Sequence, residues 1–325
     1  MIERRAFLRA ALAALAAPRS SEAQAPKAAR VIGFLGGASA DGYASLVESL
    51  RLGLRDRGYI EGANLKIEYR WADGSYERLP ALAEELVRLK VDVIVTQGTP
   101  AAFAAKAATR SIPIVMAIVG NPVESGVVAS YARPGGNVTG SSFFWGDLNA
   151  KRLEFLKTLN PKLSRAAILI NPDNLAMAEL LRAVEERSRA LKVSLQTVNV
   201  RRLDEFSAAF QQAKKQAEAA IVPEDGLFQA NADRLAELAN RNRLASIGFR
   251  AYCEVGGLLA YGVDFPYIWR QSAVLVDKIL NGAKPADLPI QQATRFELVI
   301  NLKTARALSV TIPTELQARA DQLIQ

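Results

Sequence analysis

Short apolar segments alternate with amphipathic segments along most of this chain, and the alternation starts afresh near its middle. Apolar strands separated by amphipathic helices are typical of a parallel sheet that is covered on both faces. A chain of 325 residues suits two lobes of about 150 residues each. The pattern therefore predicts an α/β fold with two doubly wound parallel-sheet lobes, one for each round of alternation.

The two rounds differ in position but not in kind. The strands predicted in the first round are VIGFL (31–35), LKIEYRW (65–71), VDVIVT (91–96) and IPIVMAIV (112–119), with helices over 43–58, 76–89 and 100–108. Those of the second round are AAILI (166–170), VSLQTVNV (193–200), AAIV (219–222) and LASIGF (244–249), with helices over 147–158, 175–190, 203–217 and 229–242. The last quarter adds strands GLLAYGVDF (257–265) and RFELVINL (295–302), with helices over 266–281 and 314–324.

The stretch PGGNVTGSSFFW (134–145) joins the two rounds and allows three interpretations. Asn137-Val138-Thr139 matches a glycosylation sequon, and Gly135-Gly136 suggests a phosphate loop, although neither usual glycine-rich phosphate motif is present. The third interpretation is a turn that feeds a β-prone strand from one lobe into the other. We favour this crossover because the stretch lies between the two rounds.

Segments 257–265 and 293–300 suit the second and third crossover strands. Two lobes joined by three crossover strands can hinge shut on a ligand. The predicted N-terminal lobe is residues 30–138 plus 263–292, and the predicted C-terminal lobe is residues 139–262 plus 293–325.

The N-terminus has the features of an export signal. Arg4-Arg5-Ala6-Phe7-Leu8 resembles a twin-arginine signal, and an alanine-rich apolar run follows over residues 10–17. That run is shorter than the roughly 20 apolar residues that span a bilayer. Residues 1–25 are therefore predicted to be an export signal peptide that directs the protein to a bacterial periplasm. The alternative is a basic amphipathic helix that belongs to the fold.

The composition removes several kinds of site. The chain has no histidine, and its one cysteine is Cys253. Histidine-based triads, histidine-ligated zinc and disulfides are thereby excluded, and we expect no catalytic residue, metal or cofactor. The formal net charge is +8, yet the basic residues form no run and no helix-turn-helix signature. We expect a solvated surface and no nucleic-acid partner.

In open α/β sheets, ligands bind outside the carboxyl ends of the strands, beside helix N-termini that favour anions. The loops at these positions, together with the end of the first crossover, supply the candidate ligand-binding residues. They are Ser39, Thr96, Gln97, Gly98, Thr99, Asn121, Ser142, Phe143, Asn171, Asn174, Asp225, Arg250 and Tyr252.

Several candidates also have a purely structural interpretation. Ser39, Thr99, Asn174 and Asp225 each precede a predicted helix, where their side chains suit N-caps. Arg250 suits either a bidentate clamp on a carboxylate or a surface ion pair. The aromatic residues of 143–145 suit either stacking on a planar ligand or packing in the core.

Four segments of the chain resemble one family. They are RWADGSYERLPALAEELV, IPIVMAIVGNPVESGVVASYARPGGNVTGSS, AYGVDF and NGAKPADLPIQQATRFELVINLKTARALSVTIP. The chain resembles, from about residue 30 to its end, the tryptophan/tyrosine-type substrate-binding proteins of ABC transporters. The resemblance implies a type I periplasmic-binding-protein fold that captures a small solute, an amino acid or an aromatic carboxylate, between its lobes. It also implies a monomer that delivers the solute to a permease and its ATPase, and meets the membrane only through that permease.

One departure from the family bears on the ligand. The family commonly has Asp-Pro-Val where this chain has Asn121-Pro122-Val123. If that carboxylate serves a ligand ammonium, Asn121 still accepts a hydrogen bond but supplies no charge. Two other function classes stay open: a ligand-sensing subunit for a membrane signalling protein, and a periplasmic enzyme that uses carboxylates such as Glu224 or Asp225.

Overall fold

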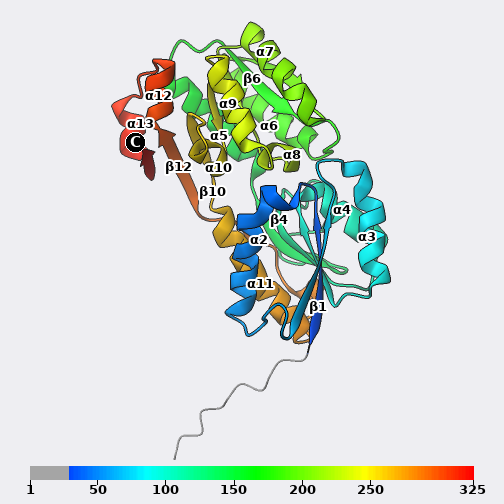
Figure 1. The fold of residues 1–325 in the computed structure, drawn as a ribbon. Helices are drawn as coiled ribbons and strands as arrows, with labels where there is room; N and C mark the ends of the chain where they lie inside the picture. Colours follow the sequence, from blue (N-terminus) through cyan, green and yellow to red (C-terminus); the bar gives the residue numbers. More distant parts are fainter. Residues whose placement is uncertain (1–28) are drawn as a thin grey trace, which may run out of the picture.

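The computed structural model describes residues 29–325, so the predicted export signal, residues 1–25, lies outside the described residues. Figure 1 shows two lobes, each built on one sheet with helices on both faces. The predicted two-lobed α/β fold is confirmed. No helix among residues 29–325 has the length and apolar character needed to span a membrane.

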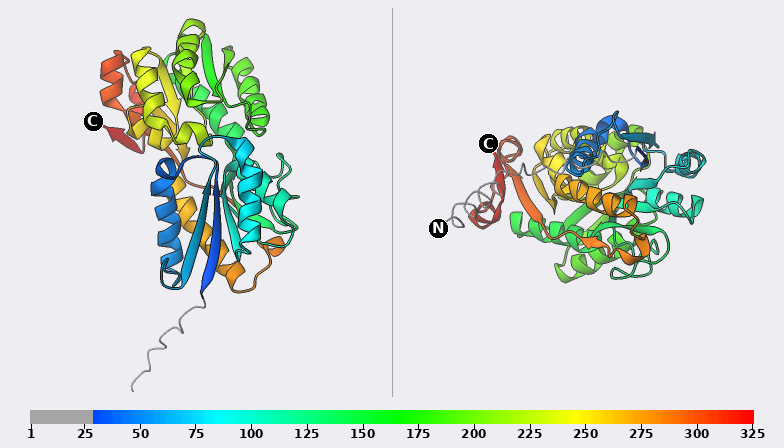
Figure 2. Two further views of the ribbon diagram at one scale, coloured as in Figure 1. Left: turned by 45° about the vertical axis from the view of Figure 1, so that its right-hand side comes forward. Right: turned by 90° about the horizontal axis from the view of Figure 1, so that it is seen from below.

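The first lobe contains a six-stranded sheet whose strand pairs are all parallel. Its strands are, in spatial order, β11 (Gln291–Gln292), β5 (Val138–Phe143), β4 (Ile114–Gly120), β3 (Val93–Gln97), β1 (Arg30–Gly36) and β2 (Leu65–Trp71). One face is covered by α2 (Ala40–Arg55) and α11 (Phe265–Leu280), and the other by α3 (Leu79–Arg88) and α4 (Gly98–Ala108). Figure 2 shows α2 and α11 side by side, although they are far apart in the sequence.

The second lobe contains a seven-stranded sheet. Its strands are, in spatial order, β13 (Gln322–Ile324), β12 (Phe296–Asn301), β10 (Leu259–Val263), β9 (Ala245–Gly248), β8 (Ala219–Ile221), β6 (Arg165–Ile170) and β7 (Ser194–Asn199). Its helices are α5 (Trp145–Leu159), α6 (Met177–Ala190), α7 (Phe206–Gln216), α8 (Gly226–Gln229), α9 (Ala232–Arg241), α10 (Arg250–Glu254), α12 (Leu302–Leu308) and α13 (Thr314–Arg319).

The chain passes between the lobes three times: after β5, after β10, and between β11 and β12. β10 runs toward the first lobe and β12 returns from it, so these two strands pair antiparallel in an otherwise parallel sheet. β5 pairs with β4 in the first sheet over its whole length. The predicted lobe boundary, between residues 138 and 139, would assign most of β5 to the C-terminal lobe. We propose that the first segment of the N-terminal lobe extends to Phe143 instead.

The crossover stretch needs its glycines. Gly135 and Gly136 have φ values of 73° and 60°, in the left-handed region that favours glycine. Gly140 has a φ of 147°, and a Cβ there would lie 2.3 Å from the carbonyl oxygen of Met116. β5 therefore approaches β4 more closely than any side chain allows, at the point where their register shifts.

The end of the chain differs from the prediction. The helix expected over 314–324 stops at Arg319, and β13 (Gln322–Ile324) then pairs with β12. The backbone groups of this exposed edge of β12 gain partners in that way, which local helix propensity does not reveal. The short helices α8, α10 and α12 were not predicted.

Candidate functional site

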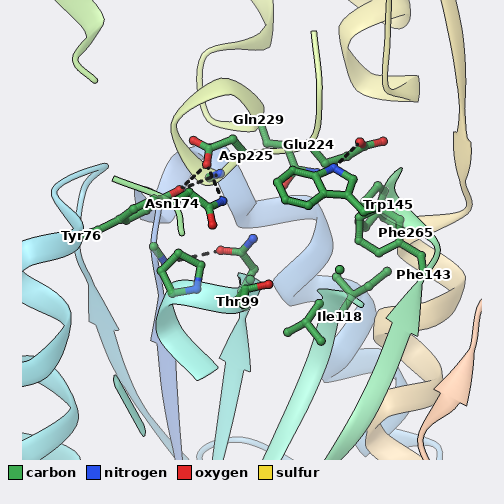
Figure 3. A pocket seen from close by; sticks show the side chains of 17 residues that line it. Tyr76, Thr99, Ile118, Phe143, Trp145, Asn174, Glu224, Asp225, Gln229 and Phe265 are labelled. Atoms are coloured by element: carbon green, nitrogen blue, oxygen red, sulfur yellow. Dashed lines mark hydrogen bonds between the residues drawn. The ribbon is translucent and has the colours of Figure 1, made fainter. Parts of the chain in front are cut away.

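A cavity of about 40 Å³ lies where the carboxyl ends of strands from the two sheets face each other (Figure 3). It is lined by residues from both lobes and from the crossover segments: Gly37, Tyr76, Gln97, Gly98, Thr99, Pro100, Ile118, Val119, Gly120, Phe143, Trp145, Asn174, Glu224, Asp225, Gly226, Gln229 and Phe265. Four of these, Tyr76, Thr99, Pro100 and Asn174, also line an adjoining groove of about 730 Å³ between α3, α4 and the loop 172–176.

The first lobe contributes the N-terminus of α4 to the cavity. Gln97 occupies the N-cap position without a side-chain capping bond, and its Oε1 accepts a hydrogen bond of 3.4 Å from the Gly37 amide. Thr99 therefore does not cap this helix; it lies in the first turn, 4% exposed, and lines the cavity. The first N–H groups of a helix have no partner within the helix, so this end of the cavity favours an anionic group.

The second lobe contributes the Asp225 carboxylate, and among residues 29–325 only neutral groups donate hydrogen bonds to it. Its donors are Asn171 Nδ2 at 3.1 Å, Asn174 Nδ2 at 2.9 Å, the Tyr76 hydroxyl at 3.0 Å and the Leu227 amide at 3.0 Å. Burial raises the pKa of Asp225, and these hydrogen bonds oppose the rise. The bond from Leu227 makes Asp225 the N-cap of the short helix α8 and not of the helix predicted over 229–242, and Asp225 also faces the cavity.

The neighbouring carboxylate, Glu224, has different partners. The Arg152 guanidinium contacts both of its oxygens, with Nη1 at 3.1 Å from Oε2. Trp145 Nε1 also donates to Oε2 of Glu224, at 3.1 Å, and Figure 3 shows this bond at the edge of the cavity. Glu224 is thus charge-compensated, whereas Asp225 is not.

Aromatic rings form the hinge-side wall of the cavity. Phe143 ends the first crossover, and its ring lies 5.8 Å from that of Phe265, centroid to centroid, at an interplanar angle of 73°. Trp145 lies 6.4 Å from Phe143 by the same measure. All three rings are buried and line the cavity together with Ile118, whereas Phe144, the remaining aromatic residue of 143–145, is exposed and does not line it.

Contacts across the seam hold the lobes together in this structure. The Tyr76 hydroxyl joins Asp225 and accepts a hydrogen bond of 3.1 Å from the Gly226 amide. Two further side-chain pairs bridge the lobes: Tyr43 with Gln229, and Asn121 with Glu179. Side chains of three first-lobe residues, Tyr76, Tyr43 and Asn121, therefore contact the second lobe.

The structure brings six of the predicted residues to the cavity wall. They are Gln97, Gly98, Thr99, Phe143, Asn174 and Asp225. Asn171 lies behind them and orients Asp225. Thr96 and Ser142 are buried in their strands and are not among the residues that line the cavity.

Four other predicted residues lie away from the cavity. Ser39 caps α2 through the Gly42 amide, at 3.3 Å, and lines an outer groove. The Asn121 side chain donates a hydrogen bond to Glu179 and accepts one from the Trp145 amide at 3.2 Å, so it links the two lobes and does not line the cavity. Arg250 pairs with Glu254 and Glu297 on the surface of the second lobe. Tyr252 is 0% exposed and bonds to Ser246 Oγ at 2.6 Å, inside the core of that lobe.

Sequence reasoning missed Tyr76, Gln229 and Phe265 as cavity residues, and it missed Arg152 as a partner of Glu224. Tyr76 and Gln229 each begin a segment that was predicted as a helix, and Phe265 ends a segment that was predicted as a strand. Only their position next to a strand end or a crossover marks them, and that signal is shared by many other residues. Trp145 carried a better signal because it directly follows the crossover strand.

A family model for ABC transporter substrate binding proteins matches residues 31–324 of this chain. The chain belongs to the ABC transporter substrate-binding protein family. It is therefore a solute-binding protein and not an enzyme.

Similar proteins agree with this assignment. A tyrosine-binding protein of Clostridioides difficile is 29% identical over 79% of this substrate-binding protein and 74% of its own length. A conserved domain protein from Vibrio cholerae, known from its crystal structure, is 28% identical and has a TM-score of 0.86 over 91% of this chain and 100% of its own. An ABC domain from Streptococcus pneumonia, solved in complex with L-Trp, is 24% identical and has a TM-score of 0.84 over 91% and 100% of the two chains. The fold is thus that of the type I periplasmic binding proteins, as expected.

Proposed function

We propose that this substrate-binding protein is the periplasmic component of an ABC importer and captures an amino acid or an aromatic carboxylate between its lobes. Residues 1–25 would direct its export as a twin-arginine signal, and the closed, loaded form would be recognised by a permease with its ATPase. Family membership supports a transporter role, and the tyrosine-binding relative supports an aromatic amino acid.

The chemistry of the cavity wall carries the proposal. The N-terminus of α4 with Thr99 suits a carboxylate, and the uncompensated Asp225 suits an ammonium group. The rings of Phe143, Trp145 and Phe265 suit a planar apolar side chain. In the part of the chain that the structure describes, no lysine or arginine lines the cavity, so a solute with several negative charges fits poorly.

The cavity volume of about 40 Å³ is room for only a few water molecules, since each needs roughly 10–15 Å³. A solute of amino-acid size therefore enters while the lobes are apart, and the wall then adjusts around it. Such a solute favours closure to the extent that it contacts both lobes at once. Thr99 and Asp225 face it from opposite lobes and would supply those contacts.

Isothermal titration calorimetry of the mature protein tests the proposal with L-tyrosine, L-tryptophan, 3-(4-hydroxyphenyl)propanoate, tyramine and benzoate. We expect one site per chain, no product from the recovered solute, and a smaller radius of gyration by X-ray scattering on binding. L-Tyrosine should bind more tightly than its analogues that lack the ammonium or the carboxylate. Failure of all five compounds to bind would refute the proposed solute class. Conversion of any of the five compounds to a product by the protein would refute a purely binding role.

A further inference from the structure

Arg152 carries a fully buried positive charge and does not line the interlobe cavity. It lies on α5, is 0% exposed, and is not among the residues that line the cavity. Its Nε donates to the Tyr261 carbonyl at 2.8 Å, and its Nη1 donates to Asn149 Oδ1 at 2.9 Å. Its remaining contacts include both oxygens of Glu224. The guanidinium is thus fixed on one side by α5 and strand β10, and presents its charge to one carboxylate.

Glu224 links Arg152 to a residue of the cavity wall, Trp145. Its Oε2 accepts from Trp145 Nε1 at 3.1 Å, while Asn149 Nδ2 approaches the same oxygen at 3.5 Å. The opposite side of the indole packs on Gly120, where an added Cβ would lie 2.9 Å from Trp145 Cβ. The Trp145 ring is therefore held between a glycine at the end of β4 and a carboxylate whose own position depends on Arg152.

Stability alone does not explain this arrangement. Replacing a buried ion pair with apolar residues of similar size is often neutral or stabilising, because the pair loses its hydration on burial. The pair instead fixes the position of the Glu224 carboxylate, and that carboxylate accepts the hydrogen bond from the Trp145 indole.

We propose that Arg152 is a positioning residue that sets the aromatic selectivity of the interlobe cavity through Glu224 and Trp145. Its action on selectivity rests on the proposed function, whereas its action on the indole does not. Removing Arg152 leaves Glu224 without its charge partner. Glu224 then rotates toward other donors, and the Trp145 ring loses its fixed orientation.

Nuclear magnetic resonance of the ligand-free protein tests the orienting role without a solute. The chain has three tryptophans, Trp71, Trp145 and Trp269, whose indole N–H signals are assigned with a Trp145→Phe variant. In Arg152→Met, the Trp145 signal should shift and exchange with solvent at least about tenfold faster, while the signals of Trp71 and Trp269 stay in place. Arg152→Lys, which keeps the charge, should restore part of the protection. An unchanged Trp145 signal in Arg152→Met overturns the proposal.

A second variant covers the case in which Arg152→Met does not fold. Arg152→Met with Glu224→Leu removes both charges together and should melt within a few degrees of the unmodified protein. Removing the surface pair Arg250–Glu297 by the equivalent changes is the matched control. The preference for L-tyrosine over L-leucine should fall about three- to tenfold in the first double variant, the range expected from losing an ordered aromatic contact, and stay constant in the control.

An unchanged preference in the folded double variant overturns the proposal, because a merely structural pair would leave selectivity intact. If the unmodified protein binds neither amino acid, the proposed function fails. The indole signals then decide the positioning role by themselves, in the single variant or, where that does not fold, by comparing the double variant with its surface control.

Discussion

The hydroxyl group of Tyr76, in the first lobe, donates a hydrogen bond of 3.0 Å to Oδ2 of Asp225, in the second lobe. The same hydroxyl accepts from the Gly226 amide at 3.1 Å. Burial and the nearby Asp225 charge raise the pKa of Tyr76 well above its ordinary value, so the hydroxyl stays a donor. One side chain thus joins the polar end of the cavity to the opposite lobe, and it does so only when the lobes meet.

Tyr76→Phe should weaken solute binding by at least about tenfold, since a hydrogen bond to a charged group contributes about 1.5–3 kcal/mol. The loss should arise from a less stable closed form, because the ring itself remains. Titration calorimetry and X-ray scattering with L-tyrosine check both parts. Tyr131→Phe is the matched control, because Tyr131 donates to Glu124 within the first lobe, at 3.1 Å, and lies away from the cavity wall. Equal losses in the two variants would contradict a role for the lobe seam.

Asp225→Asn should flatten the pH dependence of stability in the ligand-free protein. Burial raises the pKa of Asp225 from its ordinary value of 3.8. Between the unfolded and folded pKa values, the folded protein binds more protons than the unfolded chain. Its free energy of unfolding therefore falls as the pH rises through that window. The variant lacks this proton and should lose less stability over the same interval.

Urea denaturation at half-unit steps upward from pH 4 measures this difference. Asp173→Asn is the control, because Asp173 lies two residues after Asn171 but is exposed and paired with Arg201 at 3.3 Å. It should leave the pH slope almost unchanged. A slope in Asp225→Asn equal to that of the unmodified protein would show that the carboxylate does not carry the uptake of protons.

The fold and part of the site follow from patterns that are local in the sequence. The two rounds of apolar and amphipathic segments determine both sheets, because each strand and its helix bury apolar faces against each other. The rule that ligands bind at carboxyl strand ends points to Gln97, Gly98, Thr99, Asn174 and Asp225, and the structure places all five on the cavity wall. Such residues are predictable because the strand register alone brings them to the seam.

The remaining parts depend on side-chain direction and on how the lobes meet. Arg250 and Tyr252 are two residues apart on α10, so they point to different sides of the helix, one to the surface and one to the core. Glu224 and Asp225 are adjacent, yet only Glu224 meets the Arg152 guanidinium. Arg152 lies 72 residues before Glu224 in the sequence, and no spacing pattern in the sequence predicts that the two side chains meet.

Thr99→Ala should weaken solute binding about tenfold and leave the melting temperature of the ligand-free protein nearly unchanged. The hydroxyl faces the cavity, and a hydrogen bond from it to a charged solute group contributes about 1.5–3 kcal/mol. The helix keeps its start because Gln97, not Thr99, is the N-cap residue of α4. Calorimetry and differential scanning fluorimetry separate the two effects. The control is Ser39→Ala, which removes a true cap and should lower the melting temperature while affinity is kept. The reverse pattern would show that Thr99 serves the helix and not the solute.

Asn121→Asp should weaken closure, because it places a second carboxylate against Glu179 where the present amide donates a hydrogen bond. Like charges about 4 Å apart repel by about 1–4 kcal/mol near a protein surface, so solute affinity at pH 7 should fall roughly tenfold or more. The bond from the Trp145 amide to Oδ1 is kept in this variant, which leaves the seam contact as the only change. Titration calorimetry with L-tyrosine measures the loss.

Two further measurements identify the cause. Burial raises the pKa of Glu179, and Glu124 adds to the rise, so mild acid should protonate Glu179 and recover part of the lost affinity. At pH 7, Glu179→Gln combined with Asn121→Asp should restore affinity to within about threefold of the unmodified protein, because an amide again faces a carboxylate. Glu179→Gln alone is the control and should change affinity little. If the combined variant stays as weak as Asn121→Asp, Asn121 acts through Trp145 and not through the opposite lobe.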